Sequence, residues 1–266
     1  MPQLDVPLKR LRVLQTSRRD AWWGPQAITC AILTGFIVYA TWAAFQGVHY
    51  HYGPYLSPFY SPEIWGSSHH AILGPAPSWL PRWLPFTPAL LILPFPAGFR
   101  LTCYYYRGAY YKAFWADPPA CAVGEPRNSY RGERSLPLIL QNVHRYFMYA
   151  ALLFLVFLAH DVWKALWFPT ADGGTRFGIG LGTLILATNV TLLSLYTFGC
   201  HSLRHLLGGA KDILSDKPVR KACYETCGKL NTRHMLFAWC SLFGVITADV
   251  YVRLCSMGII TDLRII

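Results

Sequence analysis

The sequence predicts an all-α membrane protein, a bundle of five transmembrane helices with an outer segment rich in proline and aromatic residues. Hydrophobic residues make up 53% of its 266 positions and charged residues only 14%, whereas soluble domains have about 25% charged residues. The apolar residues gather in blocks of about 20 or more, the length that crosses a bilayer as a helix. We therefore expect one transmembrane domain over residues 1–266, with no separate soluble domain.

Prolines and glycines indicate where the expected spans kink, begin or end. Pro88, Pro94 and Pro96 should kink the second span, which neighbouring helices tolerate inside a membrane. Pro137 suits the first turn of the third span, and Gly208 follows the fourth as a helix stop. The spans expected from these limits and from the apolar blocks are 26–46, 87–106, 137–167, 177–207 and 230–257.

The outer segment, about residues 47–85, joins the first two spans. It is rich in Pro, Tyr, Trp and Gly, and its prolines argue against a long helix. Its four histidines are interpreted as interfacial or surface residues: His49, His51, His69 and His70.

Positive charge predicts how the bundle is oriented. The net charge of +11 does not indicate nucleic-acid binding, because Lys and Arg alternate between loops as the positive-inside rule requires. Basic residues crowd the N-terminus and the loops at 107–136 and 208–229, whereas the alternate loops hold almost none apart from Arg82 and Arg176. We expect a multi-pass protein of the plasma membrane with the N-terminus and both basic loops in the cytoplasm.

Histidines and cysteines gather at the expected cytoplasmic ends of spans two to five. Histidine within a membrane helix is costly and usually functional, so several at one depth indicate a metal or redox site. His201 and His205 are four residues apart and lie on the same helix face. The residues that share this depth are Cys103, His144, Cys200, His201, His205 and His234.

Two cofactors fit this set of residues. Haem b needs two histidines that face each other across the bundle, and two haems would need a second pair in the outer half, where only His160 lies within a span. A Rieske-type [2Fe–2S] cluster needs two cysteines on one iron and two histidines on the other. The residue pattern leaves both open, and a third hypothesis is a transporter with a buried proton relay, although no internal repeat supports it.

Arginine and tyrosine side chains flank these residues. Their donors can hydrogen-bond a quinone carbonyl or anchor the protein at the interface. The candidate quinone-binding residues are His144, Arg145, Tyr146, Tyr149 and Arg204. In the outer half, Asp161 with Lys164 and Asp249 with Arg253 have the spacing of local ion pairs.

From about Gly98 to the C-terminus the chain resembles a known family, the membrane-anchor (cytochrome b-type, SdhC-like) subunit of actinobacterial-type succinate dehydrogenase. The resemblance implies respiratory complex II of the tricarboxylic acid cycle, with flavoprotein and iron–sulfur subunits as partners, a quinone that is expected to be menaquinone, and no catalytic residue for succinate here. The stretches that carry it are Cys103–Arg107, Pro118–Val123, Leu138–Tyr146, Cys200–His205, Arg233–Met235 and Val250–Arg264.

The resemblance also favours a membrane-embedded Rieske-type [2Fe–2S] cluster over haem b. We expect Cys103 and Cys121 to bind one iron, since Cys121 follows a proline-stiffened turn that could return to the membrane face. We expect His205 and His234 to bind the other, since they end one helix and begin the next. The reserve ligands are Cys200, His201 and His144.

Overall fold

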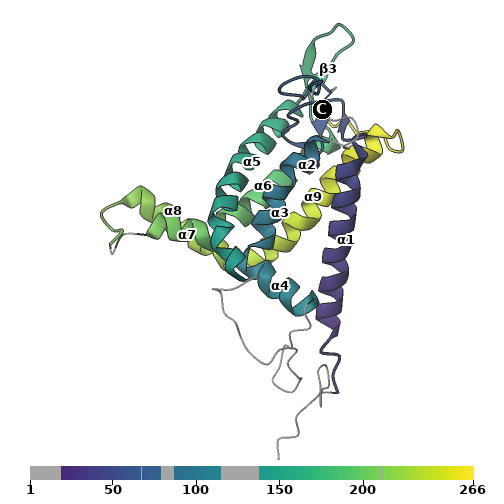
Figure 1. Cartoon of the computed structure of the whole chain (residues 1–266). Coiled ribbons are helices and arrows are strands. Elements are labelled where there is room, and N and C mark those ends of the chain that lie inside the picture. Colours follow the sequence, from purple (N-terminus) through teal and green to yellow (C-terminus); the bar gives the residue numbers. More distant parts are fainter. Residues whose placement is uncertain (1–18, 67, 79–86, 115–137, 210, 212) are drawn as a thin grey trace, which may run out of the picture.

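In the computed structural model of the chain, the described residues are 19–66, 68–78, 87–114, 138–209, 211 and 213–266. Cys121 and most of the first basic loop lie outside these ranges. Figure 1 shows the long helices running side by side between two ends of the molecule. The helices are α1 (Gly24–Gln46), α2 (Pro88–Ile92), α3 (Pro94–Leu101), α4 (Tyr104–Phe114), α5 (His144–Lys164), α6 (Leu181–Phe198), α7 (His201–Gly208), α8 (Pro218–Asn231) and α9 (His234–Ser256).

The membrane character expected from the sequence is confirmed, with a difference in the second span. Among the described residues, α1, α5, α6 and α9 are long and apolar enough to cross a membrane. The second span is the shorter apolar stretch Pro88–Leu101, which divides into α2 and α3 at Leu93. Pro94 is the first residue of α3, and a proline lacks the N–H that a continuous helix requires.

Two more breaks interrupt helices that the sequence analysis expected to be continuous. The expected fourth span, 177–207, is divided because α6 ends at Phe198 and α7 begins at His201, with Cys200 in an extended conformation between them. The second span ends at Leu101, and α4 begins only at Tyr104. A short 3₁₀ helix, η2 (Leu138–Val143), precedes α5. Apolarity alone does not reveal these turns, because the residues in them are as apolar as helical ones.

The outer segment forms a cap over one end of the bundle (Figure 1). It contains an antiparallel pair, β1 (His51–Tyr52) and β2 (Tyr55–Leu56), followed by the 3₁₀ turn η1 (Pro58–Tyr60). A second hairpin, β3 (Trp167–Pro169) and β4 (Thr175–Phe177), links α5 to α6. The expectation of surface histidines is wrong for His70, which is only 3% exposed because the segment folds back over it.

Buried polar groups fix the cap to the helices. Asp249 of α9 accepts hydrogen bonds from Ser57 and from Tyr39 (2.5 Å), and it forms the expected ion pair with Arg253 at 3.3 Å. Asp161 instead accepts a hydrogen bond from Ser61, and the described residues include no ion pair between Asp161 and Lys164. These bonds satisfy carboxylates that would otherwise be costly to bury.

The opposite end of the molecule holds the start of α1 together with α4, α7 and α8 (Figure 1). The α7–α8 arm extends sideways from the bundle there, and α6 packs most extensively against α9. The start of α1 and the helices that border both basic loops therefore share one end, as the charge pattern predicted. That this end faces the cytoplasm stays a prediction.

Candidate functional site

Two cysteines and two histidines meet at the end of the bundle opposite the cap, and each stands at a helix boundary. Cys103 lies in the break between α3 and α4, and Cys200 lies in the break between α6 and α7. His144 and His234 are the first residues of α5 and α9. These breaks and helix starts bring the four side chains into contact in pairs.

The four side chains form two cysteine–histidine pairs. The Nε2 atom of His144 lies 3.1 Å from the Sγ atom of Cys200. The Nε2 atom of His234 lies 3.4 Å from the Sγ atom of Cys103. On its other side His144 is held by Thr102, whose Oγ1 lies 2.9 Å from Nδ1. A hydrogen-bonded second ring nitrogen is how proteins orient a ligating histidine.

Aromatic rings enclose both pairs. Phe99 stacks on His144 with the ring centroids 4.8 Å apart, and Tyr196 stacks on His234 at the same distance. The two covering rings also meet each other edge to face at 5.4 Å. Cys103, Cys200, Phe99 and Tyr196 belong to one buried cluster, in which both thiols are about 2% exposed. The two pairs therefore lie against one buried cluster, in which the cysteines are buried and His234 is partly exposed.

A glycine allows the α6–α7 turn to approach α9. A Cβ atom at Gly199 would lie 3.3 Å from Nδ1 of His234 and 3.2 Å from the Leu230 carbonyl oxygen. Asn231 donates a hydrogen bond of 2.8 Å to the Gly199 carbonyl, which ties the end of α8 to the same turn. The turn thus carries Cys200 while leaving room for His234.

One arginine lies beside the site. Arg100 of α3 donates hydrogen bonds to the Tyr106 hydroxyl (2.9 Å), the Ala238 carbonyl (3.1 Å) and the Ser241 hydroxyl (2.9 Å). Its guanidinium carbon lies 4.8 Å from the centroid of the Tyr196 ring. Arg100 is therefore fixed on one face of the ring that covers His234.

The expected iron ligands are only partly brought together. Cys103 and His234 lie in the site, joined there by two reserve candidates, Cys200 and His144. His205 is exposed on α7 and pairs with His201, the two Nε2 atoms lying 3.1 Å apart. Burial lowers the pKa of His201, and His205 lowers it further. Cys121 lies outside the described residues.

The expected quinone-binding residues are exposed at this end, except for His144, which is buried, and Arg204, which is half-buried. Arg145, Tyr146 and Tyr149 are exposed on α5. Arg204 lies on α7, with its guanidinium carbon 4.8 Å from the Tyr224 ring centroid.

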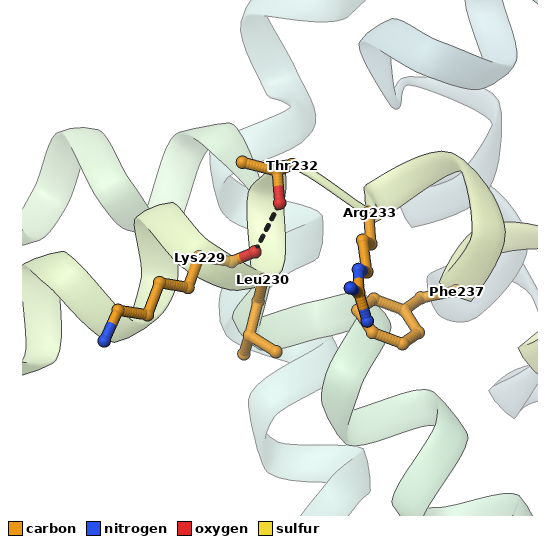
Figure 2. Close-up of a pocket in the computed structure, with 5 residues that line it drawn as sticks. All are labelled: Lys229, Leu230, Thr232, Arg233 and Phe237. Carbon is orange, nitrogen blue, oxygen red and sulfur yellow. Dashed lines mark hydrogen bonds between the residues drawn. The ribbon is translucent and has the colours of Figure 1, made fainter.

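A pocket of about 400 Å³ opens at the start of α9. Figure 2 shows Arg233 and Phe237 facing Leu230 across it, with Lys229 and Thr232 at the end of α8. Phe237 packs against the buried cluster that contains Cys103 and Cys200. The pocket therefore combines apolar walls with cationic donors one helical turn from His234.

Several residues that shape the site were not singled out from the sequence. Thr102 and Tyr196 hold the imidazoles, and Phe237 lines the pocket. Thr102 could have been noticed in the sequence because it is next to Cys103, but nothing there indicated which histidine it would contact. Among the described residues, no three His, Cys, Asp or Glu side chains converge as a single metal ion would need.

Comparisons with known proteins agree with one another. Residues 25–258 match the family model described as actinobacterial succinate dehydrogenase subunit SdhC. The chain is similar to a solved structure entitled "Mycobacterium smegmatis Sdh1 complex in the apo form", with 44% sequence identity and a TM-score of 0.85. That similarity covers 98% of this chain and 97% of the other. A search of the curated proteins finds no match.

Proposed function

Because the chain belongs to the family of the actinobacterial succinate dehydrogenase subunit SdhC, we propose that it passes electrons from the iron–sulfur subunit of that complex to a membrane quinone. As a subunit of succinate dehydrogenase, it is the membrane anchor of an oxidoreductase. Membership of this family removes the reason for the transporter hypothesis. The flavoprotein subunit would oxidise succinate, so this chain needs no succinate site of its own.

The observation that carries the proposal is the enclosed set of two thiols and two imidazoles. This is the donor set of a Rieske-type [2Fe–2S] cluster, which takes two cysteines on one iron and two histidines on the other. Cys103 and Cys200 come from two helix breaks, and His144 and His234 begin two helices, so the four residues approach from separate directions. They replace the expected set in our proposal, because His205 is exposed and paired with His201.

The surrounding residues suit such a centre. Thr102 orients His144, while Phe99 and Tyr196 each cover the ring of one histidine. Bound there, the cluster would supply one-electron transfer at a potential raised by imidazole ligation. Haem b is the alternative occupant of the same two histidines, and it would leave both cysteines without a role as ligands.

The pocket beside α9 is proposed as the quinone site. Leu230 and Phe237 offer apolar contact to a ring, and Arg233 and Lys229 offer hydrogen-bond donors to a carbonyl oxygen. The Thr232 hydroxyl donates instead to the Lys229 backbone carbonyl. Small-molecule sites usually have this composition, mostly apolar with a few placed polar groups. Because Phe237 also packs against the cysteine cluster, electrons would travel a short way from cofactor to quinone.

Chemical analysis of the purified complex distinguishes the two cofactors. We expect iron and acid-labile sulfide beyond what the iron–sulfur subunit accounts for, by about two atoms of each. The reduced complex should lack the sharp visible bands of haem b. Protoporphyrin without this additional sulfide would overturn the cluster and favour the haem.

A further inference from the structure

Arg100 is an unusual cation because it lies within the bundle. Its guanidinium is partly buried and donates three hydrogen bonds, all to uncharged groups: the Tyr106 hydroxyl, the Ala238 carbonyl and the Ser241 hydroxyl. Within the part of the chain that the structure describes, the ion pairs are Lys221–Glu225 and Arg253–Asp249, so no described carboxylate pairs with Arg100. Arg253, near the other end of α9, differs from Arg100 because it pairs with the carboxylate of Asp249.

The position of Arg100 connects it to the site. The Tyr196 ring is stacked on His234 at 4.8 Å, and the Arg100 guanidinium carbon lies 4.8 Å from the centroid of that same ring. Tyr106, which accepts one of its hydrogen bonds, belongs to the buried cluster that holds Cys103 and Cys200. The Tyr196 ring thus contacts both the positive charge and His234.

A cation in such a place needs a compensating charge. Buried charges are normally paired or lie beside metals, and an arginine inside a membrane bundle is costly and usually functional. The two tyrosine rings offer partial compensation, since the guanidinium carbon lies 5.6 Å from the Tyr106 centroid as well. Cys103 and Cys200 belong to the same buried cluster as the two tyrosines, and together with what they bind they can carry a full negative charge.

We propose that Arg100 raises the reduction potential of the cofactor held by Cys103, Cys200, His144 and His234, by stabilising the negative charge that it gains on reduction. The proposal rests on the [2Fe–2S] cluster of the proposed function. Two ferric ions, two sulfides, two thiolates and neutral imidazoles sum to no net charge. One electron from the iron–sulfur subunit gives one negative charge, which the fixed guanidinium favours and which leaves again when the electron moves to the quinone. The charge of a cluster and the hydrogen bonds near it set such potentials.

The first test is a redox titration of the cluster's paramagnetic signal in the purified complex. Arg100→Gln removes the charge and should shift the midpoint potential to lower values. Arg100→Lys retains the charge, so its midpoint potential should stay closer to that of the unchanged protein. Lys112→Gln removes an exposed charge from the adjacent α4 and should cause no shift. A structural role alone would change the amount of signal and leave its potential where it was.

A second pair of variants covers the case in which Arg100→Gln fails to assemble. Ser241→Asp places a carboxylate against the guanidinium, whereas Ser241→Asn has nearly the same size and no charge. We expect the aspartate variant to have the lower potential of the two. The first pair of variants thus changes the charge of Arg100 itself, and the second pair changes the charge of the residue beside it.

The outcomes separate this proposal from the proposed function. If the Rieske-type signal has the same potential in Arg100→Gln and Arg100→Lys, the role of Arg100 is overturned and the cluster stands. Where Arg100→Gln does not assemble, the same potential in Ser241→Asp and Ser241→Asn has the same consequence. A complex that has no such signal before any substitution would overturn the cluster itself, and the role of Arg100 with it.

Discussion

His144 is positioned by a stacked ring and by a partner at its second nitrogen, whereas the buried Nδ1 atom of His234 has no hydrogen-bond partner among the described residues. His144 has Phe99 against its ring and Thr102 at Nδ1, so Nε2 can point only toward Cys200. His234 has Tyr196 against its ring, and its Nε2 points to Cys103. Side chains held in this way approach a cofactor with little loss of conformational freedom, which is what a preorganised ligand set requires.

Substitution of single histidines distinguishes ligands from neighbours. We expect His144→Ala to abolish the cluster's paramagnetic signal and electron transfer to quinone, because a ligand is lost. Succinate oxidation with an artificial acceptor should continue at the soluble subunits. The measurements are the signal amplitude and the two activities in membranes that hold equal amounts of complex.

His205→Ala is the matched control, because His205 is an exposed histidine at the same end of the bundle. It should retain both the signal and the quinone activity. Loss of the signal in His205→Ala, with retention in His144→Ala, would restore the ligand set that the sequence alone suggested.

The sequence indicated that cysteines and histidines gather at this end of the molecule, but not which of them contact one another. Cys103 and His234 were expected as ligands, and Cys200 and His144 only as reserves. Pairing depends on how each helix is rotated and where it breaks, and the break at Cys200 turns His201 and His205 outward on α7. His205 was expected as a ligand because it ends one helix as His234 begins the next, and that argument took the fourth span as continuous to His205.

Helix packing places the residues of α3 and α5 beside each other. Gly98 makes this possible, because a Cβ atom there would lie 2.4 Å from the Phe147 ring. Phe99 and Arg100 follow it directly on α3, so the spacing between these helices also sets the position of the site. The span is short and broken by Pro94, and side-chain packing must supply the rigidity that a continuous helix would have.

Gly98→Ala tests that packing. Overpacking a well-filled contact typically costs about 1–3 kcal/mol, so we expect a lower unfolding temperature of the solubilised complex and a weakened cluster signal. Gly35→Ala in α1 is the control, since no atom would lie within 4 Å of its Cβ, and alanine favours a helix over glycine. Equal stability in the two variants would show that α3 and α5 do not need this contact.

The apolar blocks of the sequence predicted the long helices, and the prolines predicted one of the helix breaks. Pro94 identified the interruption of the second span before the structure did. The break at Cys200 has no proline, and the turn is tightened by Gly199, a residue that also occurs inside membrane helices. The cap was hidden for another reason: its tyrosines and prolines look like interfacial residues, yet Tyr55 and Tyr60 are fully buried.

At the scale of the whole molecule, the two ends differ in character. One end is capped by hairpins and by hydrogen bonds to Asp249 and Asp161. The other holds the cysteine–histidine pairs, the pocket and the α7–α8 arm, whose surface carries Lys217, Lys221 and Lys229. A basic end that holds the proposed cofactor site would suit contact with the iron–sulfur subunit, and the positive-inside rule predicts that this end faces the cytoplasm.

Labelling with a membrane-impermeant maleimide checks this orientation. Cys223 is exposed on α8, and we expect it to react only after the cells are permeabilised. A cysteine introduced by Asp172→Cys, in the exposed turn between β3 and β4, should react in intact cells. The reverse pattern would invert the orientation and place the proposed cofactor near the outside.

The central claim is that this chain itself holds a cluster with histidine and cysteine ligands. Pulsed electron paramagnetic resonance of the reduced complex tests it most directly, because it detects nitrogen atoms bound to a paramagnetic iron. We predict strong coupling to two imidazole nitrogens, lost in His144→Ala and in His234→Ala and retained in His205→Ala. A reduced complex whose iron–sulfur signals show no directly bound nitrogen would contradict the account.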